Sequence, residues 1–70
     1  MKIEVGKTYR CLLGRVDILT DVRDCDFDAK TKDGTFPYLG IIHSVGMTFY
    51  NSDGKEWRDI VGYEIYREDI

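Results

Sequence analysis

Residues 36–54 read FPYLGIIHSVGMTFYNSDG and contain two β-prone runs that end in turn signals. The first run, residues 36–45, is the most hydrophobic segment of the chain, and its proline stands near the start, where a strand tolerates it. Asp53-Gly54 lies between two aromatic runs, and glycine supplies the positive φ angle that a tight hairpin needs. The segment therefore predicts a central strand over residues 36–45, a second over 47–50 and a hairpin that returns through 55–58.

The N-terminal third carries two more runs in which apolar residues alternate with polar ones. Residues 8–13 place Tyr9, Cys11 and Leu13 on one face. Residues 15–22 place on one face Val16, Ile18, Thr20 and Val22. Residues 60–66, IVGYEIY, supply a fifth run. Helical periodicity is weak throughout, so the sequence predicts an all-β fold with five short strands.

Seventy residues predict one domain over residues 1–70, because chains divide into domains only well above this length. The formal charge is −3, and the ten Lys and Arg residues are scattered without a run of three. Affinity for a phosphate backbone comes chiefly from clustered Lys and Arg. The charge balance therefore argues against nucleic acid as the main partner.

The amino terminus, MKIEVGKTYR, has no apolar stretch of the kind found in signal peptides, and no apolar run is long enough to cross a bilayer. We therefore expect a cytosolic protein with no membrane partner. A cytosol keeps thiols reduced, and a disulfide-built mini-protein normally carries four or more cysteines. Both Cys11 and Cys25 are expected to be free thiols.

Three aspartates, Asp24, Asp26 and Asp28, follow one another at alternate positions, as do the first ligands of a calcium-binding loop. The sixth position of that loop would be Ala29, where glycine is needed, and the twelfth would be Thr35, where a bidentate glutamate belongs. A strand continued through this segment would also bury three carboxylates. We therefore expect an exposed acidic loop over residues 24–35 and no metal site.

Other reactive residues form no recognisable catalytic or metal-binding pattern. Cys11, Cys25 and His43 lack the paired spacing of a zinc site, which needs four ligands. A phosphate-binding loop and a hydrolase nucleophile elbow are both absent from the sequence. We therefore expect no catalytic residue, no cofactor and no enzymatic activity.

The chain has more large aromatic residues than a core built from 70 residues can hold. Tyr9, Phe49 and Trp57 are expected in that core. The tyrosines expected at the surface are Tyr38, Tyr50, Tyr63 and Tyr66. Exposed tyrosine offers a large contact area at low entropic cost together with a polar tip. The surplus therefore favours a binding surface.

The order of the segments GKTYRC, GRVDIL, PYLGII, TFYNSDGKEW and DIVGYEI resembles small accessory proteins encoded by bacteriophages and prophages. The resemblance spans about residues 6–66 and departs from the family in the long acidic insertion at residues 24–35. It implies a five-stranded barrel of Src-homology-3-like architecture, or a strongly bent antiparallel sheet. It also implies a protein that acts in the cytosol of an infected bacterium.

These observations lead to one functional hypothesis and two alternatives. The hypothesis is a non-enzymatic module that binds a host protein and inhibits it, through Tyr38, Tyr50, Tyr63, Tyr66 and the acidic residues Asp24, Asp26 and Asp28. One alternative is a nucleic-acid-binding face formed by Tyr9, Arg10, Tyr50 and Arg58. The other is an assembly component, a homo-oligomer paired through exposed strand edges.

Overall fold

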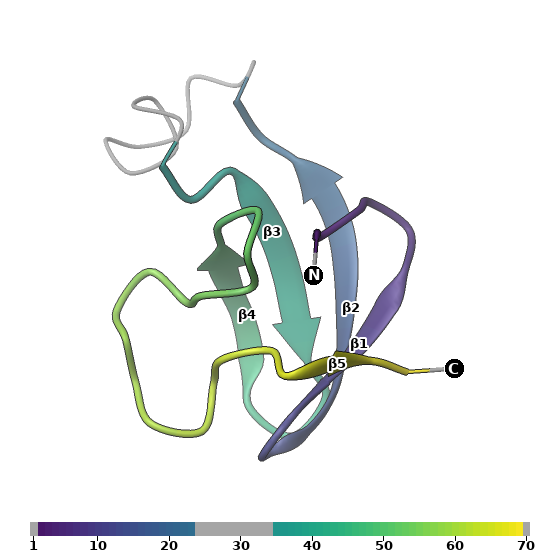
Figure 1. Ribbon diagram of the computed structural model, residues 1–70, viewed down its shortest axis with the longest axis vertical. Coiled ribbons are helices and arrows are strands. Elements are labelled where there is room, and N and C mark those ends of the chain that lie inside the picture. The colour runs from purple at the N-terminus through teal and green to yellow at the C-terminus, as the bar shows by residue number, and fades with distance from the viewer. Residues whose placement is uncertain (1, 24–34, 70) are drawn as a thin grey trace.

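Five antiparallel strands form a single sheet in the computed structural model, which describes residues 2–23 and 35–69 (Figure 1). Along the chain they are β1 (Thr8–Cys11), β2 (Gly14–Asp21), β3 (Tyr38–Ile42), β4 (Gly46–Tyr50) and β5 (Arg67–Glu68). Their order across the sheet is β4-β3-β2-β1-β5. The described residues include no helix, so the expected all-β class is confirmed. The central strand is β2, with β3 beside it, and not β3 as the hydrophobicity of residues 36–45 suggested.

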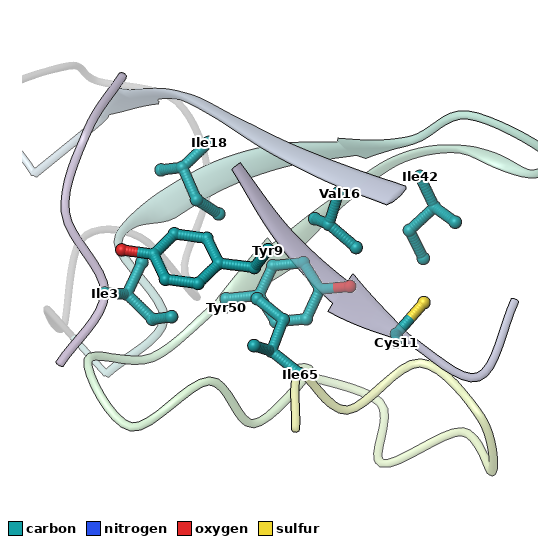
Figure 2. Packing of buried hydrophobic residues seen from close by; sticks show 8 residues of the cluster. All are labelled: Ile3, Tyr9, Cys11, Val16, Ile18, Ile42, Tyr50 and Ile65. Atoms are coloured by element: carbon teal, nitrogen blue, oxygen red, sulfur yellow. The ribbon is translucent and has the colours of Figure 1, made fainter. Parts of the chain in front are cut away.

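One face of the sheet carries the core, and its rings and aliphatic side chains pack as shown in Figure 2. Alternation along β1 and β2 directs inward the side chains that the sequence pattern predicted, Tyr9 and Cys11 from one strand and Val16 and Ile18 from the other. Residues outside the strands complete the cluster. Ile3 and Ile65 cover the Tyr9 and Tyr50 rings from the side opposite β2.

A bulge in β2 changes which residues face the core. The register with β3 shifts between Ile18 and Thr20, so Leu19 is left as the extra, exposed residue. Thr20 is thereby exposed, which corrects its predicted place beside Val16. Val22 is buried as expected, and its N–H donates to Pro37 O at 2.9 Å. Of the expected acidic loop over residues 24–35, residues 24–34 and the aspartates among them lie outside the described residues.

The turn at residues 51–54 forms as the Asp-Gly signal predicted. Gly54 N donates to Asn51 O at 3.1 Å, and Gly54 has a φ angle of +90°. The Asn51 side-chain Oδ1 also accepts from the N–H groups of Asp53 and Lys55, each at 2.9 Å. The returning segment is short, since only one bridge joins Tyr50 to Glu56 within the described part of the chain.

The expected fifth strand over residues 60–66 is wrong. Those residues form turns, and positive φ angles at Asp59 (55°) and Gly62 (92°) prevent a continuous extended backbone there. Pairing with β1 begins at Tyr66, whose N–H donates to Arg10 O at 3.0 Å, and continues through the two residues of β5.

Two aromatic residues expected in the core, Phe49 and Trp57, are not fully buried. Thr48 and Tyr50 of β4 point inward, so Phe49 points outward, and both Phe49 and Trp57 are only half-buried. Gly40 of β3 explains this choice of face. A Cβ at Gly40 would lie 3.2 Å from carbons of the Tyr50 ring, so the glycine makes room for that ring.

The 51–54 turn also ties the two ends of the sheet together. Ile3 N donates to Ser52 O at 2.9 Å, and Ile65 N donates to Gly54 O at 3.0 Å. These two bonds bring the N-terminal segment and the residues before β5 against the same turn. The result is a strongly bent, open sheet whose inner face is covered by its own connections (Figure 1).

We expect Gly54→Ala to lower the free energy of unfolding by roughly 2–3 kcal/mol, because alanine at a positive φ angle is strained and its Cβ would also crowd the Ile65 side chain. A Cβ at Gly54 would lie 3.1 Å from Ile65 Cβ. Gly46→Ala is the matched control, since Gly46 has φ +132° but nothing within 4 Å of its Cβ position. It should cost only about 1–2 kcal/mol in urea unfolding. Equal losses for the two variants would contradict the packing argument.

Candidate binding surface

A buried carboxylate organises the segment that follows β4. The Glu56 side chain is 1% exposed and accepts a hydrogen bond from the Thr48 hydroxyl. It also accepts bonds from Arg58 N at 2.9 Å, from Arg58 Nε at 3.0 Å and from Ile60 N at 3.3 Å. One side chain therefore fixes the backbone of residues 56–60 against the sheet.

The charge state of Glu56 follows from two opposing effects. Burial alone would raise its pKa, but the hydrogen bonds from Thr48, Arg58 and Ile60 outweigh burial, and the pKa is lowered. The group is therefore an ionised carboxylate at neutral pH. Arg58 supplies its counter-charge and remains partly exposed.

The Arg58 guanidinium group also lies over two aromatic rings. Its guanidinium carbon lies 5.1 Å from the centroid of the Trp57 ring and 5.7 Å from that of Tyr63. Tyr63 is half-buried, and its carbonyl oxygen accepts a hydrogen bond from the Tyr50 hydroxyl at 2.8 Å. The segment after Glu56 is thus attached to the core at both ends.

The expectation that Tyr50 lies at the surface is wrong. Tyr50 is 0% exposed, because β4 directs it toward Gly40 and its hydroxyl finds a partner inside the protein. Burial raises the pKa of its phenol well above the usual value. Tyr50 is therefore a core residue that holds the Tyr63 backbone.

The three remaining tyrosines differ in exposure and in place. Tyr66 is 55% exposed and lies beside Arg67, with 5.8 Å between the guanidinium carbon and the ring centroid. Tyr38 is half-buried, packs against the core, and is covered by Arg23 at 5.7 Å. It pairs with Asp21 at the end of β2 farthest from the β1–β2 turn. Tyr38 and Tyr66 are therefore not brought together on one surface. Asp24, Asp26 and Asp28 lie outside the described residues.

An apolar surface that the sequence did not reveal lies where the β1–β2 turn meets the 60–66 segment. We call it the turn-end surface and define it by Leu12, Leu13, Val61 and Tyr66. Val61 is 92% exposed and Leu12 is 76% exposed. The two segments touch, because a Cβ at Gly62 would lie 3.7 Å from Leu13 Cγ.

A shallow groove of about 550 Å³ adjoins this surface, lined by Leu12, Gly62, Glu64, Ile65 and Tyr66. Its lining mixes apolar and polar atoms, and Glu64 contributes the single carboxylate of that lining. The sequence signal is available in part, since Leu12-Leu13 stands directly before Gly14 and Val61 directly before Gly62. Both stretches also fit the pattern of a β-strand, so the sequence alone does not show that they lie in turns.

A second group of polar side chains lies on the outer face of the sheet. His43 Nε2 is 2.7 Å from Asp17 Oδ2, and the Thr8 hydroxyl donates to Asp17 Oδ1 at 2.8 Å. These hydrogen bonds, with a further contribution from Arg15, lower the pKa of Asp17. Cys11 is buried on the other face, so it cannot act with His43 as a nucleophile and base. Cys25 lies outside the described residues.

Within residues 2–23 and 35–69, no three His, Cys, Asp or Glu side chains are placed to share a metal ion. In the same residues no helix is long and apolar enough to cross a membrane. Comparison of the chain with models of protein families, with curated proteins and with solved structures found no match.

We expect Glu56→Gln to lower the free energy of unfolding at pH 7 by roughly 1–3 kcal/mol, because an amide cannot accept all the donors that face the carboxylate. The folded-state pKa of Glu56 is lower than its ordinary value of 4.5. Its carboxylate therefore adds stability above that pH, and this contribution is lost as the pH falls through the lowered pKa.

Asp17 and Asp21 also have lowered pKa values, so the wild type loses further stability in acid for other reasons. The informative quantity is the difference in urea unfolding between wild type and Glu56→Gln, measured from neutral pH to about pH 3. That difference should shrink as the pH falls. A difference independent of pH would contradict an ionised Glu56, and the exposed Glu64→Gln variant should show little change at any pH.

Proposed function

We propose that this chain is a non-enzymatic protein-binding module whose contact area is the turn-end surface and its groove. The observation that carries the proposal is the high exposure of Val61 and Leu12 beside the half-exposed Tyr66. Apolar side chains gathered on one part of a small protein mark an interaction site more often than isolated ones do. Aromatic residues such as Tyr66 often provide the anchoring contacts of an interface.

The chemistry of the groove indicates the kind of partner segment. Leu12 and Tyr66 in its lining suit contact with an aliphatic or aromatic side chain, and Glu64 at the same groove suits a neighbouring Lys or Arg of the partner. The net charge of −3 favours a partner with a basic surface. The aspartates Asp24, Asp26 and Asp28 fit this role as charges that steer association.

The resemblance to phage and prophage accessory proteins of Src-homology-3-like architecture supports a setting for this activity. In that setting the chain acts in the cytosol of an infected bacterium and binds a host protein, with inhibition of a defence factor or enzyme as the outcome. The strongly bent five-stranded sheet is compatible with that architecture. Fold alone is a weak warrant for function, so the proposal is founded on the surface.

The nucleic-acid alternative required Tyr9, Arg10, Tyr50 and Arg58 to share one exposed face of the protein. Tyr9 and Tyr50 are both buried, so neither can stack on a base. Arg10 lies on the opposite side of the sheet from them, because it alternates with Tyr9 and Cys11 along β1. The four residues of that hypothesis therefore do not form one surface.

A bacterial protein captured by the purified chain and identified by mass spectrometry should lose affinity when the turn-end surface is changed. We expect Leu12→Ser, Val61→Ser and Tyr66→Ala each to weaken the complex, and at least one of them by about thirtyfold, because binding energy concentrates in a few anchors. Affinity is measured by calorimetry with the purified partner.

Met47→Ser is the matched control, since Met47 is 66% exposed but lies on the sheet's outer face. It should leave the affinity unchanged. Equal affinity for all four variants would place the interface elsewhere. Capture of only the chain itself would favour the assembly alternative. Capture of only nucleic acid, with release at raised salt, would favour the nucleic-acid-binding alternative.

Replacing Asp24, Asp26 and Asp28 together by asparagine should mainly slow association and reduce its dependence on salt, as expected of charges at the rim of an interface. Stopped-flow association rates at two or three salt concentrations measure this. An unchanged association rate with a faster dissociation rate would instead place the aspartates inside the contact area.

A further inference from the structure

The register of three strands aligns cationic side chains in one row across the outer face. Arg10 of β1 lies directly opposite Arg15 of β2 on one side and opposite Arg67 of β5 on the other. Residues opposite each other in antiparallel strands project from the same face, with Cβ atoms about 5 Å apart. His43 extends the row beyond Arg15, since His43 N donates to Arg15 O at 3.1 Å. We call these four residues the arginine row.

Like charges placed directly opposite each other in a sheet are destabilising. Nearby carboxylates do little to neutralise the positive charge of the arginine row. Asp17 lies 3.8 Å from Arg15 Nε, but it also accepts from Thr8 and contacts His43. Glu68 belongs to the other face and pairs with Lys7 at 3.7 Å. Among the described residues, neither Arg10 nor Arg67 forms an ion pair with a carboxylate.

Arg10 carries a second, independent sign of a missing partner. Its Nε atom is buried and has no hydrogen-bond partner within the described structure. A buried guanidinium donor without an acceptor is costly and rare. The flanking Arg67 uses one Nη only for the Glu68 carbonyl, at 3.1 Å. Arg15 Nε and Nη2 each lie 3.4 Å from His43 Nε2. The row therefore combines excess positive charge with one unsatisfied donor, Arg10 Nε.

We propose that the arginine row binds a compact phosphate-type oxyanion, such as a phosphate or pyrophosphate group. Guanidinium groups recognise such groups through paired N–H donors. Adjacent strands lie about 4.8 Å apart, so the row from Arg15 to Arg67 extends about 10 Å. One or two phosphate groups fit that length.

A nucleic-acid strand fits the same row less well. The next cross-strand row carries the carboxylate of Asp17, which would repel a phosphate backbone that continues beyond the arginine row. The rest of the chain is acidic overall and would repel an extended polyanion. The row adjoins the turn-end surface at one point, where the Tyr66 ring lies 5.8 Å from the Arg67 guanidinium carbon, but anion binding there does not depend on the proposed protein partner.

Calorimetric titration of the purified chain with sodium pyrophosphate and with inorganic phosphate, at low and constant ionic strength, tests the proposal. We expect saturable binding, tighter for pyrophosphate, that Arg10→Gln weakens by about tenfold or more. The matched control is Arg23→Gln, because Arg23 is already paired with Asp21 and lies outside the row. It should bind as the wild type does.

Thermal unfolding without added anion separates a lost site from a lost fold. Arg10→Gln should melt at the same temperature as the wild type or above it, because it removes like-charge repulsion. Pyrophosphate should raise the melting temperature of the wild type more than that of Arg10→Gln. No saturable binding, or an equal loss in Arg23→Gln, would overturn the proposal. Tighter binding of a short single-stranded oligonucleotide than of pyrophosphate would overturn the compact ligand in favour of nucleic acid.

Discussion

The buried negative charge of Glu56 is the constraint that determines how the segment after β4 covers the inner face of the sheet. Removing a carboxylate from water is costly, and here the cost is offset by a hydroxyl from β4, a guanidinium and two backbone N–H groups. Those two N–H groups belong to a segment without regular structure of its own. The charge thus gives residues 56–60 a defined conformation, and the Tyr50 hydroxyl continues the attachment at Tyr63. The turn-end surface is held in place by polar bonds made in the interior.

The two faces of the sheet serve different purposes because of register. On the inner face, alternation and the bulge at Leu19 bring aliphatic and aromatic side chains into one cluster. On the outer face, the same pairing brings Arg10 between two other arginines. The apolar turn-end surface and the arginine row are therefore distinct features of one scaffold. They suit ligands of different chemistry, an apolar protein segment and a small oxyanion.

Local signals in the sequence predicted the parts of the fold that are determined locally. The Asp-Gly turn and the alternation around Tyr9 and Val16 depend on neighbouring residues, and both are as expected. The faces of β4 could not be assigned this way. Met47 and Phe49 are more apolar than Thr48 and Tyr50, yet the latter pair faces inward because Gly40 on another strand leaves space for the Tyr50 ring. The turn-end surface and the arginine row could not be predicted from the sequence for the same reason. Leu12 meets Gly62, and Arg10 meets Arg67, only after distant segments pair.

The hydrogen bond from Val22 N to Pro37 O has a consequence for how this chain can change. It joins residue 22 to residue 37, next to a β2–β3 ladder that contains the bulge at Leu19 and continues toward the other end of the sheet. The entropic cost of closing a loop grows only slowly with its length. The bond and the ladder therefore define an attachment point at which an experimenter can graft a foreign peptide between residues 23 and 35.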